Sequence, residues 1–225
     1  MLESKQILLV EGDSDKSFFE KICKNLSLDA TVKVTPPKDI GGTHNSKSGV
    51  LNQIPILLPQ LNDGQKTNIA AIVDADYVST HGLGCERTIE QIAKILNDFD
   101  FQLKTNIPNE NGLYFENSDG LSDFGLWVMP DNKQEGMLED WIKSCIKEDE
   151  KVLFQSASNV VKNLPHPKFK PHLTTKAEVA TWLAWQKTPG HGLYSAIKEE
   201  LLDENSIIFK NLCQWLKNIF PKPEE

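Results

Sequence analysis

The chain of 225 residues is long enough to bury a substantial hydrophobic core, as one domain or as one domain with an appendage. It is 39% hydrophobic and 25% charged, which is typical of globular proteins, and no stretch resembles a membrane-spanning helix or a signal peptide. The net charge of −8 weakens the case for a dedicated nucleic-acid-binding protein, because such proteins usually carry a basic face. An acidic chain could still act on nucleic acid through a bound metal or together with a partner that binds the nucleic acid.

The cysteines and histidines show no pattern of metal ligands. The four cysteines are scattered, with no Cys-x-x-Cys pair, at Cys23, Cys85, Cys145 and Cys213. This spacing predicts reduced, mostly buried thiols in a cytoplasmic protein rather than disulfides or zinc ligands. The five histidines have no ligand spacing either, and His166 and His172 fall in a proline-rich connector.

The first half of the chain alternates between predicted strands and predicted helices. Short apolar runs that stop at turn residues are typical of buried strands, and apolar stripes with a spacing of three or four are typical of helices. In chain order we expect a strand at 6–10, a helix capped by Asp13 or Ser14 and running to Leu26, a strand at 31–35, a helical stripe at 50–61 interrupted by Pro55, a strand at 69–73 and a helix at 86–99.

The second half begins with a weaker region of short strands at 101–116. A buried strand at 124–129 and an amphipathic helix at 136–146 follow. Strands that alternate with helices predict an α/β fold with a mostly parallel sheet and flanking helices. We assign residues 1–148 to this α/β core.

After residue 148 the pattern is helical. A proline-punctuated connector at 165–171 separates the first helical stretch from three further ones. Residues 149–225 are therefore predicted to form a C-terminal helical extension of the same domain. Because Trp182, Trp185 and Trp215 present too much aromatic surface to remain free, we expect these helices to pack on the sheet.

Carboxylates follow two of the buried strands. Glu11 comes directly after the first, and Asp74 and Asp76 follow the strand at 69–73. Ligands of open α/β sheets bind at the carboxyl ends of the strands, and a hard divalent cation relieves the repulsion between acids gathered there. The sequence therefore predicts a Mg²⁺ or Mn²⁺ site, with Asp74 and Asp76 facing the same way along an extended stretch. The alternative is that these acids only favour a helix start and a turn.

Val10-Glu11-Gly12 together with Asp74-x-Asp76 resembles the signature of the TOPRIM domain, which topoisomerases, bacterial primases, recombination-repair proteins and OLD-type nucleases share. The longer form Leu9-Val10-Glu11-Gly12-Asp13-x-Asp15 is closest to the OLD-nuclease variety. Three further runs, at 125–132, 136–140 and 182–186, resemble a family of free-standing TOPRIM-like proteins of unknown function. The resemblance covers nearly the whole chain and implies a four-stranded parallel sheet and Mg²⁺-dependent chemistry on phosphodiesters.

The resemblance also implies roles for four acidic residues. Glu11 matches the general acid or base of TOPRIM domains, and Asp74 and Asp76 match the metal ligands. Asp15 matches the extra acidic residue of the OLD-type pattern.

Four other residues, together with Gly41-Gly42, are weaker candidates. Asp131 and Glu139 follow the strand at 124–129 and could complete a second ion site, or could cap a helix start. Lys133 and Lys176 could neutralise phosphate charge, or could be solvated surface residues. Gly41-Gly42 could hold a loop near phosphate, or could form a plain flexible turn.

Three functions compete. The first is a Mg²⁺-dependent nuclease or phosphotransferase acting on DNA or RNA, in which two ions hold the reacting oxygens and Glu11 moves a proton. The second is a catalytically idle module that binds nucleic acid, nucleotide or a partner ATPase; the chain itself has no nucleotide-binding phosphate loop. The third is a receiver of the response-regulator type, suggested by the acidic start, but Met129-Pro130-Asp131 stands where a receiver has Lys-Pro.

Topoisomerase and primase activities are not expected, because their second modules have no counterpart here. The sequence does not indicate an oligomeric state.

Overall fold

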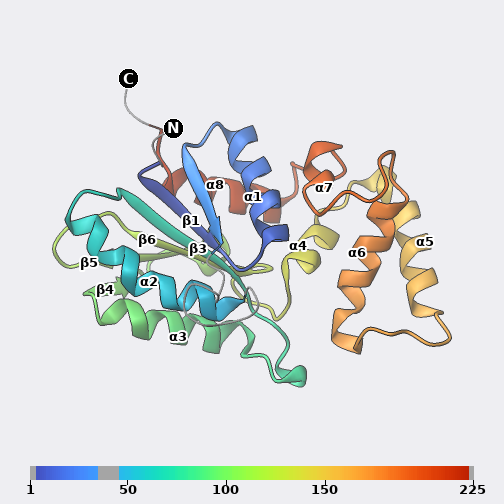
Figure 1. Ribbon diagram of the computed structural model, residues 1–225, viewed down its shortest axis with the longest axis horizontal. Coiled ribbons are helices and arrows are strands. Elements are labelled where there is room, and N and C mark those ends of the chain that lie inside the picture. The colour runs from blue at the N-terminus through green and yellow to red at the C-terminus, as the bar shows by residue number, and fades with distance from the viewer. Residues whose placement is uncertain (1–3, 35–45, 223–225) are drawn as a thin grey trace.

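The computed structural model describes residues 4–34 and 46–222, and a single six-stranded sheet runs through its centre (Figure 1). The strands are β1 (Gln6–Val10), β2 (Ala30–Val34), β3 (Asn68–Asp74), β4 (Phe101–Leu103), β5 (Leu113–Asn117) and β6 (Phe124–Met129). The α-helices are α1 (Asp13–Leu26), α2 (Lys47–Asn62), α3 (Gly84–Asn97), α4 (Leu138–Ser144), α5 (Lys151–Lys162), α6 (Thr174–Ala184), α7 (Ser195–Lys198) and α8 (Ile207–Ile219). Short 3₁₀ turns occur at Val78–Thr80, Asn109–Asn111, Glu148–Glu150 and Pro171–Leu173.

The strands lie in the order β2-β1-β3-β6-β5-β4. The first four are parallel to one another, and β5 and β4 form an antiparallel edge. The predicted α/β fold with a mostly parallel sheet is confirmed. The weak strand pattern at 101–116 supplied the antiparallel pair, of which β4 has only 3 residues.

Helices cover both faces of the sheet, which explains why β1 is apolar at nearly every position. Successive side chains of a strand point to opposite faces. Ile7 and Leu9 therefore pack with α2 and α3, while Leu8 and Val10 pack with α1, α4 and α8. Figure 1 shows α2 and α3 on one side of the sheet and α1 and α8 on the other. A strand buried on both faces cannot carry polar residues in its interior.

The last helix packs directly on the sheet. Trp215 of α8 is fully buried, with its ring 5.6 Å from that of Trp127 in β6. Two glycines allow this approach: a Cβ at Gly112 would lie 2.0 Å from Trp215, and one at Gly125 would lie 2.7 Å from Ile219. The expectation that the C-terminal helices pack on the core is confirmed for α8.

Helices α5 and α6 lie side by side beyond the carboxyl ends of the parallel strands (Figure 1). Phe154 of α5 packs edge-on against Trp182 of α6, at a ring distance of 5.9 Å, and Trp182 is fully buried. Trp185 was expected to be buried but is 43% exposed, so that prediction is wrong. It lies one residue beyond the last turn of α6, where the helical stripe no longer applies.

Two local predictions also need correction. The residue that caps α1 is Gly12 rather than Asp13 or Ser14, so the capping residue itself has no side chain to bond to the helix start. Helix α2 is not interrupted: Pro55 lies inside it, because the buried face formed by Ile54, Leu57 and Leu58 stabilises the helix despite the missing N–H.

The predicted state of the cysteines is confirmed, since all four are free and buried. Across the described ranges, no helix has both the length and the apolar character that crossing a membrane requires.

Candidate acidic site

The candidate site begins where two neighbouring parallel strands end. Glu11 follows β1 directly, and Asp74 is the last residue of β3. Oε1 of Glu11 accepts a hydrogen bond of 2.9 Å from the backbone N–H of Asp74. The predicted meeting of these two acids at one edge of the sheet is therefore observed.

Asp74 also fixes the start of α4. Its Oδ1 accepts a hydrogen bond of 3.0 Å from the N–H of Leu138, the first residue of that helix. The next residue, Glu139, is buried with 5% of its surface exposed. The positive end of the helix dipole favours a carboxylate at this position, and the contact brings Glu139 towards the strand ends.

These acids line an open cavity of about 680 Å³ between the sheet and α6. One wall carries Glu11, Asp74, Glu139 and, from the first turn of α1, Asp15. The opposite wall is formed by α6 and the segment 190–193. Of the eight residues proposed from the sequence, the structure brings these four together with Lys176.

Lys176 of α6 also lines this cavity. Its Nζ lies 3.4 Å from an oxygen of Glu139, and half of its side chain remains exposed. Burial lowers the pKa of Lys176, but Glu139, Asp74 and Asp15 outweigh that effect and hold the pKa above its usual value. Lys176 therefore stays charged and partly balances the acids.

The surroundings of these acids disfavour their charged forms. Burial raises the pKa of Glu11 to about 7, and the charges of Asp76 and Asp15 add to the increase, against Lys47 and the Asp74 N–H. Burial, with Glu139, raises the pKa of Asp15 to about 6. Burial and the neighbouring acids raise the pKa of Asp74 well above its usual value. The ionised forms of these acids are therefore disfavoured, and a cation bound among them would stabilise those forms.

Asp76 is placed differently from Asp74. Its φ of 60° ends the extended stretch, so the two carboxylates do not continue along one face of a strand. Oδ2 of Asp76 accepts a hydrogen bond of 2.8 Å from Nζ of Lys47, the first residue of α2. Asp76 lies beside the site, paired with a lysine, and does not line the acidic cavity.

Asp131 and Lys133 lie outside the acidic cavity. Oδ1 of Asp131 accepts hydrogen bonds from the backbone N–H groups of Lys133 and Gln134, at 3.0 and 2.7 Å, so Asp131 organises a turn. Nζ of Lys133 pairs with Glu110 at 2.7 Å. Gly41-Gly42 lies outside the described residues.

The donor set has the chemistry of a Mg²⁺ or Mn²⁺ site, because carboxylate oxygens are the ligands that such ions prefer. As the side chains lie, however, no three His, Cys, Asp or Glu residues among those described converge closely enough to hold one metal ion. Oxygens of Glu11 and Asp74 accept bonds from backbone N–H groups instead. An ion would require these side chains to turn towards a common point.

Three residues that support the site, Tyr77, Asp140 and Lys47, were missed by the sequence analysis. Asp140 accepts a hydrogen bond of 2.6 Å from the Tyr77 hydroxyl and one of 2.9 Å from the N–H of Met137, and it ties the segment after β3 to the start of α4. Its position next to Glu139 in an acidic pair was a usable signal. No such signal existed for Lys47, because its pairing with Asp76 depends on the tertiary fold.

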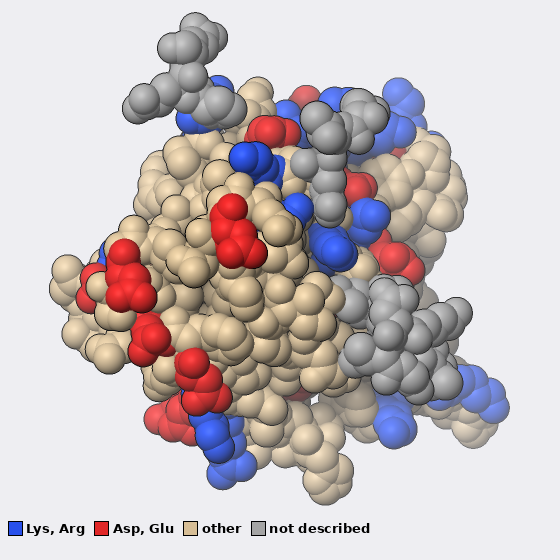
Figure 2. Space-filling model, turned by 60° about the vertical axis from the view of Figure 1, so that its left-hand side comes forward, with Lys and Arg blue, Asp and Glu red and all other residues tan. Residues whose placement is uncertain are grey.

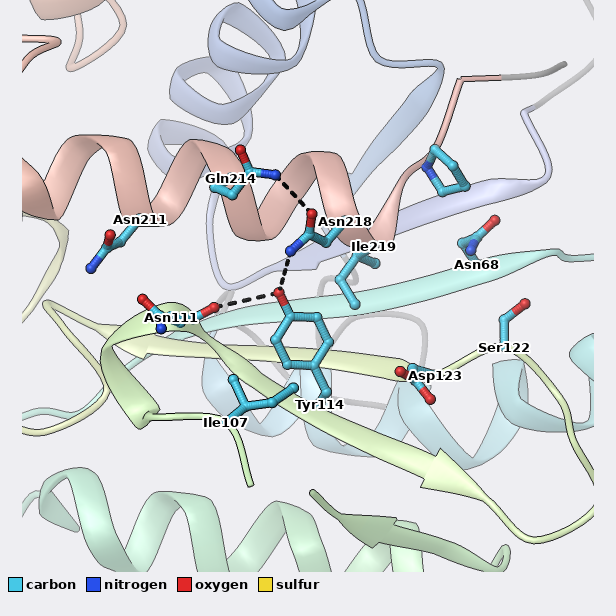
Figure 3. A pocket seen from close by; sticks show the side chains of 11 residues that line it. Asn68, Ile107, Asn111, Tyr114, Ser122, Asp123, Asn211, Gln214, Asn218 and Ile219 are labelled. Carbon is cyan, nitrogen blue, oxygen red and sulfur yellow. Dashed lines mark hydrogen bonds between the residues drawn. The ribbon is translucent and has the colours of Figure 1, made fainter. Parts of the chain in front are cut away.

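A second cavity, of about 690 Å³, lies at the opposite end of β3, beside α8 (Figure 3). Amide side chains dominate it, and the Tyr114 hydroxyl accepts a hydrogen bond from Asn218 at 3.1 Å. Its one lining carboxylate, Asp123, pairs with Lys104 at 2.7 Å. This cavity therefore offers no free acidic cluster.

Figure 2 shows one face of the surface: Lys and Arg side chains lie mainly towards its upper and right-hand borders, with acidic side chains among them. Further acidic side chains lie along its left, and a broad central area carries no charge. No continuous basic stripe crosses the part of this face that the structure describes.

The fold and the site together define an α/β protein with a mostly parallel sheet and an acidic cavity at the carboxyl ends of its central strands. Within this class, the chain belongs to the family described as "Protein of unknown function (DUF3226)", which matches residues 5–221. Comparisons with curated proteins and with solved structures gave no match.

Proposed function

We propose that the protein is a Mg²⁺- or Mn²⁺-dependent nuclease or phosphotransferase that acts on the phosphodiesters of DNA or RNA. The observation that carries this proposal is the meeting of Glu11, Asp15, Asp74 and Glu139 in one cavity at the ends of two parallel strands. Acids with raised pKa values in an open cavity are typical of functional sites rather than of surfaces.

Each wall of the cavity has a role in this proposal. A divalent ion held by the acids would polarise the phosphoryl group and stabilise its developing charge. Glu11, with a pKa of about 7, can take up or release a proton near neutral pH. Lys176 faces the acids across the cavity and can neutralise a phosphate oxygen.

The resemblance to TOPRIM domains supports the proposal. The four parallel strands β2-β1-β3-β6 match the four-stranded sheet that the resemblance implies, with Glu11 after β1 and Asp74 at the end of β3. A receiver has less support, because receivers use the order 2-1-3-4-5, whereas this sheet ends in an antiparallel pair.

Two observations favour a second candidate, a catalytically idle module that binds nucleic acid, nucleotide or a partner ATPase. No three acids in the described residues converge on one point, and Asp76 already has Lys47 as its counter-ion. Both features are what a site without bound metal would have.

The test is cleavage of single-stranded and duplex DNA and RNA in millimolar Mn²⁺, by the wild-type chain and by Glu11→Gln. Glutamine keeps the oxygen that accepts the Asp74 N–H but cannot move a proton. We expect Glu11→Gln to lose about 10²- to 10⁴-fold of the rate. The matched control is Glu116→Gln, an exposed acid on β5, which should retain the wild-type rate.

Cleavage that survives Glu11→Gln would contradict the mechanism. Inactivity of the wild-type chain with every metal, substrate and partner ATPase tested would favour the idle module instead.

A further inference from the structure

Lys47 is held much more tightly than a surface lysine. Its Nζ lies 2.8 Å from Oδ2 of Asp76, and only 12% of the Lys47 side chain is exposed, against 45% for Asp76. A lysine is rarely this buried unless it is paired, because removing its charge from water is costly. The ion pair is therefore a built part of the fold rather than a chance surface contact.

Asp76 is also fixed in place through its backbone. Its N–H donates a hydrogen bond of 3.0 Å to the carbonyl oxygen of Gly136, and its φ is 60°. The segment packs so closely that a Cβ at Gly82 would lie 2.5 Å from the Asp76 Cβ. The backbone of Asp76 is therefore held where the ion pair with Lys47 forms.

The pair stands next to the acidic site. Asp76 is two residues beyond Asp74, and both are tied to the segment that leads into α4: Asp76 through Gly136, and Asp74 through Leu138. The ammonium group of Lys47 therefore neutralises the second of the two acids that follow the interior of β3.

We infer that Lys47 is a built-in cation that takes the place of a second metal ion at Asp76, so that the acidic site binds a single divalent ion, on the side of Glu11 that faces the cavity. The count of a single ion rests on the proposed function. Asp76 is then a positioning residue that holds Lys47, while Asp15, Asp74 and Glu139 are the acids available to bind the ion.

The test is the number of Mn²⁺ ions bound per chain, measured by titration with detection of free Mn²⁺ by electron paramagnetic resonance. We expect the wild-type chain to bind one ion and Lys47→Met to bind a second, because methionine keeps the apolar stem but leaves Asp76 without a counter-ion. The double variant Lys47→Met/Asp76→Asn should return to one ion. Lys104→Met is the matched control, since Lys104 pairs at 2.7 Å with Asp123, which lines the other cavity.

The outcomes separate this inference from the proposed function. An equal number of ions in the wild type and in Lys47→Met would overturn the inference, whatever that number is. No ion in the wild type but one in Lys47→Met would support the role of Lys47 and count against the proposed metal-dependent function.

Asp76→Asn in the wild-type background provides a second test that does not depend on the folding of Lys47→Met. It should still bind one ion, because Asp76 is not a ligand in this account. Loss of that ion would overturn the inference.

Discussion

Asp74 is the residue at which the opposing forces in the site are easiest to separate. It is surrounded by Glu11, Asp15 and Glu139, and its Oδ1 accepts a hydrogen bond from Leu138. The hydrogen bond stabilises the start of α4, whereas the neighbouring charges repel. A substitution that keeps the acceptor and removes the charge therefore isolates the repulsion.

We expect Asp74→Asn to raise the melting temperature of the metal-free protein at neutral pH by about 2–4 °C, corresponding to about 1 kcal/mol in a chain of this size. The stabilisation that Mn²⁺ gives to the wild type should be smaller in this variant. Differential scanning calorimetry in EDTA and in Mn²⁺ measures both effects. A lower melting temperature in EDTA would show that the charge of Asp74 does not destabilise the fold.

The raised pKa of Glu11 predicts that the free energy of unfolding depends on pH. That pKa is raised from 4.5 to about 7 in the folded chain, so between these values the folded state binds more protons than the unfolded state. The stabilisation from protonated Glu11 is therefore complete below pH 4.5 and is lost as the pH rises towards 7. The loss amounts to at most roughly 3 kcal/mol.

Urea unfolding in EDTA at several pH values between 5 and 7.5 tests this prediction. The wild-type chain should lose stability relative to Glu11→Gln as the pH rises, because glutamine does not titrate. Parallel curves for the two proteins would contradict the raised pKa of Glu11.

At the scale of elements, α4, α5 and α6 meet at one buried carboxylate. Only 1% of the Glu178 side chain of α6 is exposed, and it accepts hydrogen bonds from Lys143 of α4 at 2.8 Å and from Ser158 of α5 at 2.7 Å. Lys162 lies 3.6 Å from the same carboxylate. Because α6 also carries Lys176, Glu178 positions one wall of the acidic cavity.

Glu178→Ala should lower the free energy of unfolding by about 2–3 kcal/mol, because it leaves a buried hydroxyl and a lysine without their partner. Urea denaturation measures the change. The control is Glu148→Ala, whose side chain is 88% exposed although it pairs with Lys151, and which should change stability by less than about 0.5 kcal/mol. Similar losses for the two variants would show that the buried network does not hold these helices together.

The sequence was most informative for strands that are buried on both faces of the sheet. Residues 69–73 and 124–129 could be assigned to central strands because both faces of the sheet are covered, and the same logic placed Glu11 and Asp74 at one edge. It was less informative where local and tertiary forces compete. The turn at Asp131, the exposure of Trp185 and the pairing of Lys47 with Asp76 depend on neighbours that no local pattern reveals.

At the scale of the whole molecule, the C-terminal helices complete one of the two cores. Trp182, Trp215 and Phe220 are fully buried in the same cluster as Val10 of β1. Gln6 of β1 also donates a hydrogen bond of 3.0 Å to the carbonyl oxygen of Pro221. The division into a core at 1–148 and an extension at 149–225 stays a prediction, and these contacts make the two parts interdependent.

A chain truncated after residue 164 should therefore be aggregation-prone and lack a cooperative thermal transition, because it exposes the apolar face that α8 covers. A chain ending at residue 222 is the control and should melt like the full-length protein. Solubility and circular dichroism on heating distinguish the two. A soluble 1–164 fragment that melts cooperatively would show that the last helices are not part of the core.

The central claim is that the acids at the ends of β1 and β3 form a site for a single divalent cation. The most direct measurement is an anomalous difference map from a crystal of the full chain soaked in Mn²⁺. We predict one peak in the cavity, beside Glu11 and within coordination distance of oxygens from Asp74 and either Asp15 or Glu139. A map with no peak there, or with a peak at Asp76 in place of the Lys47 ammonium group, would contradict it.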